Sequence, residues 1–424
     1  MLSLAGLRGV GKTTLMWQTA HYIETQHPQS IFFFNVNTLK NLGIDLHIAL
    51  EAFQRHILKK RFYELSEPIT LLFDEVHDDE NWSKTLKILY DEARIAFILC
   101  TGSSALLLNS TADLSRRMHM LKVYPFSFSE LLHAKKEINQ NPEIVTPSLD
   151  LASQFKQALF FSETVADLMG QLDQLKPIVN AILSQKAIEI PHLQHQYIHF
   201  LNFPNLLFFE DEIIITQSIL DLFKRIIHED IPKLKPTFTD FIKIERLILR
   251  LAGSDEINPE KLAGIVGVKK DDIHELIDIL AKAEILNILI PFGGLDTKII
   301  KNKKAFFMSP SLRKALLSTL YGQDLPEQMK SKLVEDVVVM YLRRVLTDGV
   351  ISYVSGGQDA NPDFVIETRD KPILLEIGSQ KTSTKQLKKS KINNRYSLLV
   401  SNGVVEPILK ENSIHIPLGW FLLL

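Results

Sequence analysis

The first hundred or so residues alternate between near-continuous apolar runs and stretches in which apolar residues recur every three or four positions. The runs lie at 31–36, 69–73 and 95–100, and runs of this kind predict strands that are buried on both faces. The stretches that follow Lys12 and that span 46–64 have the apolar spacing of helices. This alternation predicts an α/β fold in which helices cover a parallel sheet.

A glycine-rich loop follows the first apolar strand. Its sequence fits the P-loop pattern at every fixed position. The glycines allow positive φ angles and close backbone approach, so that successive N–H groups can point at an anion. Lys12 would contact the β- and γ-phosphates, and the Thr13 hydroxyl would ligate Mg²⁺. The sequence therefore predicts a nucleotide site formed by Gly6, Leu7, Arg8, Gly9, Val10, Gly11, Lys12, Thr13 and Thr14.

The apolar run 69–73 ends in Asp74 and Glu75, which is the Walker B arrangement. Asp74 would hold Mg²⁺ through water, and Glu75 would act as the general base that polarises the attacking water. Such a pair on its own is also a common exit from a strand, but its position after a P-loop favours the catalytic interpretation. The sequence has no Asn-Lys-x-Asp motif for reading guanine, which favours ATP over GTP.

The run 95–100 ends in a small polar segment that contains Ser103. P-loop ATPases with an additional central strand keep a sensor for the γ-phosphate at this place, and we expect Ser103 to serve as that sensor. The alternative is that this residue caps a short helix that starts at Ala105.

These motifs together resemble one family. The glycine loop, the segment Phe73–His77 and the segment Leu114–Arg117, followed by Pro125-Phe-Ser-Phe, are similar to prokaryotic AAA+/STAND-type ATPases. In that family an ATPase core precedes a winged helix and a C-terminal region of unknown function. The resemblance implies an AAA+ core over 1–132. It also implies that Arg117 is an arginine finger or sensor, acting in its own subunit or in a neighbour; the alternative is a surface arginine.

The middle of the chain predicts helices and then a winged helix-turn-helix. Residues 133–238 are expected to form a helical lid or connecting region over the nucleotide. Within 239–322, helices at 241–251, 260–265 and 270–283 precede a hairpin made of 288–294 and 298–307. The predicted recognition helix, 270–283, opposes DNA binding because it is rich in carboxylates, namely Asp271, Asp272, Glu275 and Asp278. A structural role or a protein contact is therefore favoured for this module, although lysines in the wing could touch phosphate.

Residues 323–424 predict the order α-β-β-β-α-β. Glu335, Asp363 and Glu376 have the order of carboxylates in the PD-(D/E)xK nuclease fold, in which they gather Mg²⁺ and a nearby lysine aids the nucleophile. The chain departs from that pattern because Gly378 stands where the lysine is expected. Lys381 could substitute only if the chain turns back after the strand. We therefore expect a nuclease-like fold whose site is degenerate, followed by a basic stretch over 381–395.

Composition narrows the class of protein. Apolar residues make up 46% and charged residues 23%, as in globular proteins, and the net charge of −2 implies no general attraction to nucleic acid or anionic membranes. The single Cys100 excludes an intrachain disulfide framework. No apolar run is long enough for a membrane span, and the first residues do not have the pattern of a signal peptide. We expect a cytoplasmic protein without a membrane partner. Because the chain starts directly on the first strand, we also expect a truncated or unusual start.

The sequence thus predicts an ATPase that uses ATP and Mg²⁺ and couples its nucleotide state to an unidentified protein or to DNA, with homo-oligomerisation left open. Two alternatives remain at this stage. One is an ATP-dependent nuclease acting on DNA, and the other is an ATP-bound switch or scaffold that does not hydrolyse.

Overall fold

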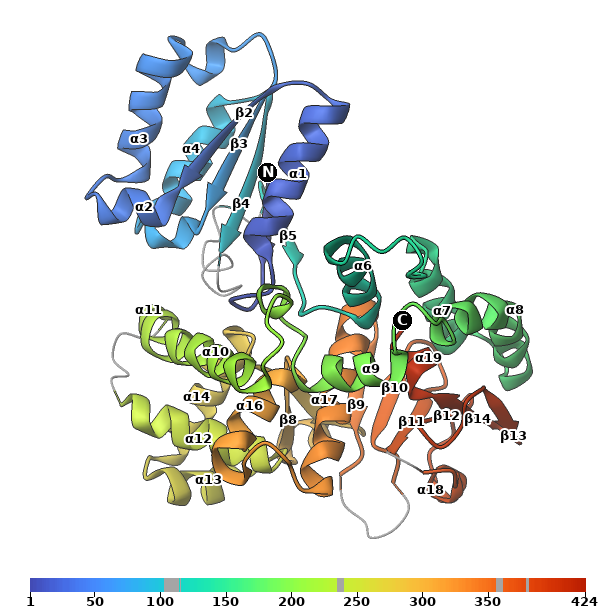
Figure 1. Cartoon of the computed structure of the whole chain (residues 1–424). Coiled ribbons are helices and arrows are strands. Elements are labelled where there is room, and N and C mark those ends of the chain that lie inside the picture. Colours follow the sequence, from blue (N-terminus) through green and yellow to red (C-terminus); the bar gives the residue numbers. More distant parts are fainter. Residues whose placement is uncertain (103–113, 115, 235–239, 356–360, 379–380) are drawn as a thin grey trace.

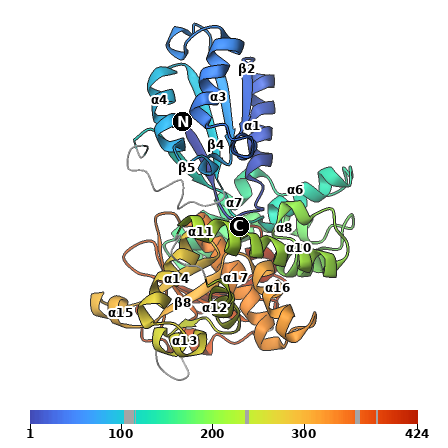
Figure 2. The same cartoon turned by 90° about the vertical axis from the view of Figure 1, so that its left-hand side faces the viewer.

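The computed structural model describes residues 1–102, 114, 116–234, 240–355, 361–378 and 381–424. The chain forms an N-terminal unit (residues 1–122) and a C-terminal unit (residues 126–424), as Figure 1 shows, and Figure 2 shows the same division from a second side. The end of the P-loop lies where the two units meet.

The N-terminal unit contains a five-stranded sheet in the order β2-β3-β4-β1-β5, and every neighbouring pair is parallel. Two separate apolar clusters lie on its two faces, one with Met16 of the first helix and one with Leu50 and Leu86 of later helices. Helices therefore cover both faces, as an α/β fold requires. The elements are β1 (Leu2–Ala5), α1 (Lys12–Gln26), β2 (Ser30–Asn35), α2 (Val36–Asn41), α3 (Leu46–Phe53), β3 (Ile69–Asp74), α4 (Trp82–Glu92), β4 (Ala96–Gly102) and β5 (His119–Lys122).

The three strands predicted from apolar runs are present as β2, β3 and β4, but the predicted helix over 46–64 is shorter than expected. It ends at Phe53 and continues as a π-helix, η1 (Gln54–Leu58), before a 3₁₀ turn, η2 (Phe62–Glu64). Lys59 adopts a left-handed conformation with φ 53°, which stops the helix. The side chain of Gln54 then accepts a hydrogen bond from the Phe62 backbone at 3.0 Å.

Residues 128–234 are mainly helical, as the sequence predicts, but they do not form a single lid. Tyr396 donates to the carbonyl of Leu159 at 3.0 Å, and Thr368 donates to that of Phe160 at 2.9 Å, so the first of these helices pack on the C-terminal sheet. Only the later part lies near the P-loop. The elements are α6 (Phe128–Ile138), α7 (Leu149–Phe161), α8 (Val165–Leu183), α9 (Ile190–His199), η4 (Pro204–Leu206), α10 (Glu212–Arg225), η5 (Ile226–Asp230) and α11 (Ile231–Leu234).

Residues 241–307 contain four helices and three short strands. Asn258 caps one helix by accepting from Lys261 N at 3.0 Å, and Gly267 with φ 77° ends it, both as expected from the sequence. The predicted strand 298–307 starts only at Lys303, because the residues after Gly294 form a short helix. The elements are α12 (Phe241–Gly253), β6 (Glu256–Ile257), α13 (Pro259–Val266), α14 (Lys270–Lys282), β7 (Leu286–Pro291), α15 (Leu295–Ile300) and β8 (Lys303–Phe307).

The last hundred residues complete a mixed nine-stranded sheet in the order β13-β14-β12-β11-β10-β9-β7-β8-β6. The parallel pairing of Ile290 in β7 with Ser352 in β9 joins the small strands to the larger set. Among the described helices, none is long and apolar enough to cross a membrane. The elements are α16 (Pro310–Tyr321), α17 (Glu327–Val345), β9 (Val350–Tyr353), β10 (Phe364–Glu367), β11 (Ile373–Gly378), α18 (Lys385–Lys389), β12 (Ser397–Ser401), β13 (Ile408–Lys410), β14 (Ser413–Pro417) and α19 (Leu418–Phe421).

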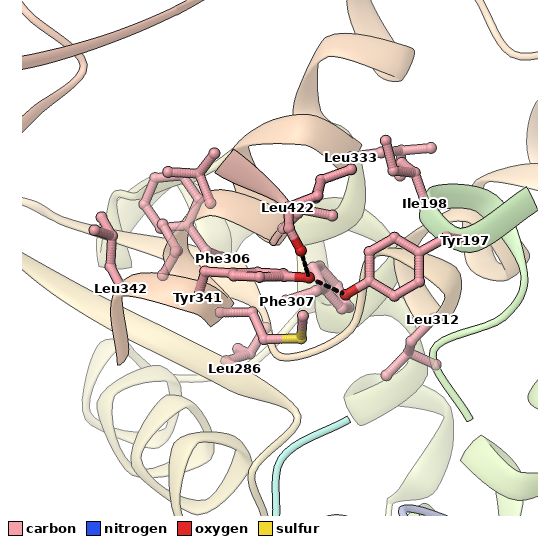
Figure 3. Packing of buried hydrophobic residues seen from close by; sticks show 14 of the residues in the cluster. Tyr197, Ile198, Leu286, Phe306, Phe307, Leu312, Leu333, Tyr341, Leu342 and Leu422 are labelled. Atoms are coloured by element: carbon pink, nitrogen blue, oxygen red, sulfur yellow. Dashed lines mark hydrogen bonds between the residues drawn. The ribbon is translucent and has the colours of Figure 1, made fainter. Parts of the chain in front are cut away.

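One continuous apolar cluster runs through the C-terminal unit, and α17 passes through its centre (Figure 3). The Tyr341 hydroxyl donates to the carbonyl of Leu422 at 2.9 Å and lies 3.2 Å from the Tyr197 hydroxyl. It also accepts from the Phe128 backbone at 2.7 Å. Segments from α6, α9, α17 and the chain end therefore share one hydrogen-bonded centre within the apolar core.

A buried arginine fastens α16 to two neighbouring segments. Arg313 is fully buried; its Nη1 donates to Asp255 at 2.8 Å and its Nε lies 2.7 Å from Asp336 Oδ2. Asp336 also accepts from the Phe307 backbone at 2.8 Å. Because a buried charge is costly without a partner, these three side chains depend on each other.

The Arg313 network can be tested by removing its cation. Arg313→Met keeps most of the side-chain length but leaves Asp255 and Asp336 without it. We expect the free energy of unfolding, measured by urea titration, to fall by roughly 3 to 5 kcal/mol. Lys330→Met removes a cation that pairs with Asp324 and Glu327 at the surface and should leave the midpoint unchanged. A loss of under about 1 kcal/mol for Arg313→Met would contradict this account.

Candidate functional site

The P-loop connects β1 to α1 at the carboxyl edge of the parallel sheet. Gly9 and Gly11 have φ angles of 86° and 91°, a conformation that side chains other than glycine rarely adopt. A Cβ atom at Gly6 would lie 2.3 Å from the carbonyl oxygen of Val123. Each of these three positions therefore requires glycine for a local physical reason, and Gly11 places the first turn of α1 directly after the loop.

Lys12 is buried at the start of α1. Its ammonium donates to the carbonyls of Gly6 at 3.1 Å and Leu7 at 3.2 Å. Burial lowers the pKa of Lys12, although the carboxylates of Glu75, Glu284, Asp230 and Asp74 oppose this shift. The Lys12 ammonium thus already contacts the loop that would bind the phosphates.

Thr13 and Asp74 lie side by side. The Thr13 hydroxyl donates to Asp74 Oδ1 at 3.0 Å. These are two hard oxygen donors, and Mg²⁺ in P-loop sites takes few protein ligands because phosphate and water oxygens complete its shell. The residues present therefore fit Mg²⁺ at this place.

Thr101, at the end of β4, was missed by the sequence analysis. Its hydroxyl forms a short hydrogen bond to Asp74 and accepts from the Glu75 backbone at 3.0 Å. It thereby orients both acidic residues of the neighbouring strand β3. The signal was available in the sequence, because Thr101 is the polar residue that follows the apolar run, two positions before Ser103. Ser103 itself lies outside the described residues.

Glu75 follows β3 in a left-handed conformation with φ 55°, which is uncommon for a residue with a side chain and is typical of functional sites. Its Oε2 lies 3.5 Å from Nδ1 of His77. Burial raises the pKa of Glu75, while Lys12 opposes the shift. Burial also lowers the pKa of His77 to about 3, so its imidazole is neutral near pH 7.

The structure also places four other residues that the sequence predicted for this site. Thr14 is exposed on α1. Arg117 pairs with Asp91 of α4, with Nε 2.9 Å from Oδ1, at the surface of the N-terminal unit. Leu7 and Val10 are buried, but they belong to the apolar cluster of the C-terminal unit.

The C-terminal unit contacts the P-loop directly. Arg8 Nη1 lies 2.6 Å from Glu229 Oε2, and Lys233 Nζ lies 2.7 Å from Asp78, three residues beyond Glu75. Both partners come from the η5–α11 segment, which bridges the loops that follow β1 and β3. The sequence analysis found no such residues, because the contacts join positions more than a hundred residues apart.

A second group of carboxylates lies in the C-terminal sheet. Burial, followed by the charges of Asp255 and Asp363, raises the pKa of Glu335 to about 7. Burial and the charge of Glu376 raise that of Asp363 to about 7. The Asp363 carboxylate accepts from the backbone N–H of Ile377 at 2.7 Å, which places it beside Glu376. Among the described residues, no three His, Cys, Asp or Glu side chains are gathered closely enough to form a metal-ion site by themselves.

Lys381 turns back toward this group. It forms short contacts with Glu376 and with Gln386, and its carbonyl accepts from the Ser401 hydroxyl at 2.7 Å. A Cβ atom at position 378 would lie 2.3 Å from that of Lys381, so glycine at 378 makes room for the lysine. Within the basic stretch 381–395, the structure forms only the short helix α18.

Comparison with known proteins finds two family models in different parts of the chain. A family model described as an AAA domain matches residues 1–132, and a second, described as a domain of unknown function (DUF8612), matches residues 195–321. A crystal structure of RV1404 from Mycobacterium tuberculosis matches with 19% identity and a TM-score of 0.14 over 33% of this chain and 80% of that chain, too slight a likeness to inform the fold.

Three relatives are all described as uncharacterized proteins. MJ1637 of Methanocaldococcus jannaschii is 31% identical over 100% of this chain and 85% of its own length. MJ1544 of the same organism is 22% identical over 80% of this chain and 65% of its own. A protein of Haemophilus influenzae is 26% identical over 47% of this chain and 50% of its own. From the full-length match, the chain belongs to the family of MJ1637, and its N-terminal AAA domain implies the use of ATP and Mg²⁺.

Proposed function

We propose that the protein is an ATPase whose nucleotide state controls the position of its C-terminal unit. The observation that carries this proposal is the set of contacts at the carboxyl edge of the sheet. There, Thr13 donates to Asp74, and Thr101 contacts both Asp74 and the backbone of Glu75. The P-loop, the Walker B acid and the next strand thus meet at one point.

The residues of the loop have separate roles in this proposal. The backbone N–H groups of residues 9–14 and the Lys12 ammonium bind the β- and γ-phosphates. Thr13 and Asp74 would hold Mg²⁺, which would supply positive charge beside the phosphate oxygens. Glu75 accepts a proton from the attacking water, and a raised pKa suits that role. Ser103 and Arg117 remain candidates for a sensor and an arginine finger.

The C-terminal unit is the part that would transmit the nucleotide state. The order of elements from α12 to β8 supports the proposal of a winged helix-turn-helix, and the order of α17 and β9 to β12 supports the proposal of a PD-(D/E)xK-like module. We propose these as modules at 239–322 and 323–424, after a connecting region at 133–238 and the core at 1–132. An unidentified protein or DNA is the proposed partner.

A second candidate function is an ATP-dependent nuclease. One observation favours it: Lys381 reaches Glu376 although Gly378 occupies the usual lysine position. In such a site Asp363 and Glu376 would hold the metal ion, and Lys381 would lie beside the attacking water.

The ATPase proposal predicts two different defects. Lys12→Ala should weaken ATP binding by on the order of a hundredfold, because a charged hydrogen-bond donor is lost. Glu75→Gln should keep binding and lower steady-state hydrolysis by on the order of a hundredfold or more, because the base is lost. Lys40→Ala and Glu80→Gln change exposed residues of the same unit and serve as matched controls. Tight ATP binding without hydrolysis in the wild type would instead support the switch alternative.

The nuclease candidate predicts cleavage of duplex DNA that requires Mg²⁺ or Mn²⁺ and ATP. Asp363→Ala should abolish it, and Asp370→Ala, an exposed carboxylate beyond the same strand, should not. Cleavage would be followed on end-labelled DNA. Equal cleavage by wild type and Asp363→Ala would attribute it to a contaminant and reject this candidate.

The raised pKa of Asp363 predicts a pH-dependent difference in stability. In the folded state the pKa of Asp363 is about 7, against an ordinary value of 3.8, so the carboxyl keeps its proton until the pH approaches 7. The resulting stabilisation is complete below the ordinary pKa and is lost as pH rises to about 7. The Asp363→Asn side chain cannot ionise, so it does not lose this stabilisation as the pH rises. Between pH 5 and pH 8, the free energy of unfolding of the variant should therefore increase relative to that of the wild type by on the order of 2 kcal/mol. Urea titrations at both pH values test this, with Asp370→Asn as control; a difference that is independent of pH would contradict it.

A further inference from the structure

Carboxylates of the C-terminal unit border the P-loop on the side of its cations. Glu229 pairs with Arg8 at 2.6 Å. Asp230 is only 2% exposed, and its Oδ1 has no hydrogen-bond partner among the described residues. Glu284 is 4% exposed, accepts from the Leu7 backbone and lies 3.5 Å from Lys122.

The cations of the P-loop partly neutralise two of these carboxylates, Asp230 and Glu284. Arg8 is the strongest charge favouring ionisation of Asp230, and Lys12 contributes as well. Lys122 and then Lys12 act on Glu284 in the same way. Burial nevertheless raises the pKa of both carboxylates, so they are incompletely compensated where they lie.

Apolar contacts hold the loop against the same unit. Leu7 and Val10 are buried in the apolar cluster of the C-terminal unit. A Cβ atom at Gly9 would lie 2.6 Å from Leu222 of α10. Glu229 and Asp230 belong to η5, which is a π-helix, a form that is rare and often found at functional positions.

We propose that Glu229, Asp230 and Glu284 form an acidic clasp that holds the P-loop against the C-terminal unit, and that the phosphates of ATP displace it. The phosphates need the same Arg8 and Lys12 cations, and their negative charge repels the three carboxylates at close range. ATP binding therefore loosens the contact between the units. This inference rests on the proposed function, because it requires ATP to bind at the P-loop.

The first test is the affinity for ATP, measured by calorimetry on the full chain with Mg²⁺. Asp230→Asn and Glu284→Gln keep the side-chain shape and remove the charge, so each should bind ATP about tenfold more tightly than the wild type. Glu245→Gln is the matched control, because Glu245 of α12 pairs with His228 of η5 rather than with the P-loop. Its affinity should equal that of the wild type.

The second test follows the distance between the units. Cysteines introduced as Lys60→Cys and Lys269→Cys lie on exposed positions of the two units, and native Cys100 is fully buried and will not take a dye. Energy transfer between the dyes should fall when Mg·ATP is added. It should already be low without nucleotide when Glu229→Gln, Asp230→Asn and Glu284→Gln are combined.

The outcomes separate the clasp from the ATP site. If Lys12→Ala weakens ATP binding while Asp230→Asn and Glu284→Gln bind like the wild type, the clasp is rejected and the ATP site stands. Unchanged energy transfer in the combined variant without nucleotide also rejects the clasp. If wild type and Lys12→Ala bind ATP equally poorly, the proposed function fails, and the clasp fails with it.

Discussion

The C-terminal unit depends on the neutralisation of charges that it buries. Arg313 lies among apolar side chains with Asp255 on one side and Asp336 on the other. Removing Arg313 leaves the fully buried Asp336 without its cation, which is far more costly than losing a surface pair, while Asp255 keeps Lys332 at 2.6 Å. Asp255 follows α12 and Asp336 lies on α17, so this one cluster connects the segment 241–307 to the segment formed by the last hundred residues.

This connection limits how the molecule can change shape. The pairing of β7 with β9 makes the strands of the two segments one sheet, and a single apolar cluster lies on it. A displacement between those segments would break the sheet and expose the Arg313 cluster. The junction between the two units at the P-loop differs, because ion pairs such as Arg8 with Glu229 and Lys233 with Asp78 form much of the contact there. The Arg8–Glu229 pair is partly exposed and can be exchanged for contacts with phosphate or water at small cost, whereas Asp78 is buried.

Local chemistry explains which parts of the site could be predicted from the sequence. The P-loop and the end of β3 were recognisable because fixed spacing in the chain corresponds to fixed geometry, as the φ angles of Gly9 and Gly11 show. Thr101 was missed because its role depends on β4 lying beside β3, a relation between strands rather than a motif. Strand β5 was also missed; its four residues have no distinct apolar run, and pairing with β1 defines it. The contacts of Glu229 and Lys233 depend on tertiary packing that no local pattern encodes.

The nuclease-like carboxylates are connected to the N-terminal unit through the segment that follows β5. Tyr124 donates to the carbonyl of Arg343 at 2.9 Å, and Arg344 pairs with Glu130. Both arginines lie on α17, the helix that also carries Glu335 two turns earlier. A shift of the N-terminal unit would therefore pull on α17 at its C-terminal end. Because α17 is rigid and is held by the Arg313 cluster at its middle, such a shift acts on the whole nine-stranded sheet rather than on one strand. The contacts of Tyr124 and Glu130 thus join the segment that follows β5 to the helix that carries Glu335.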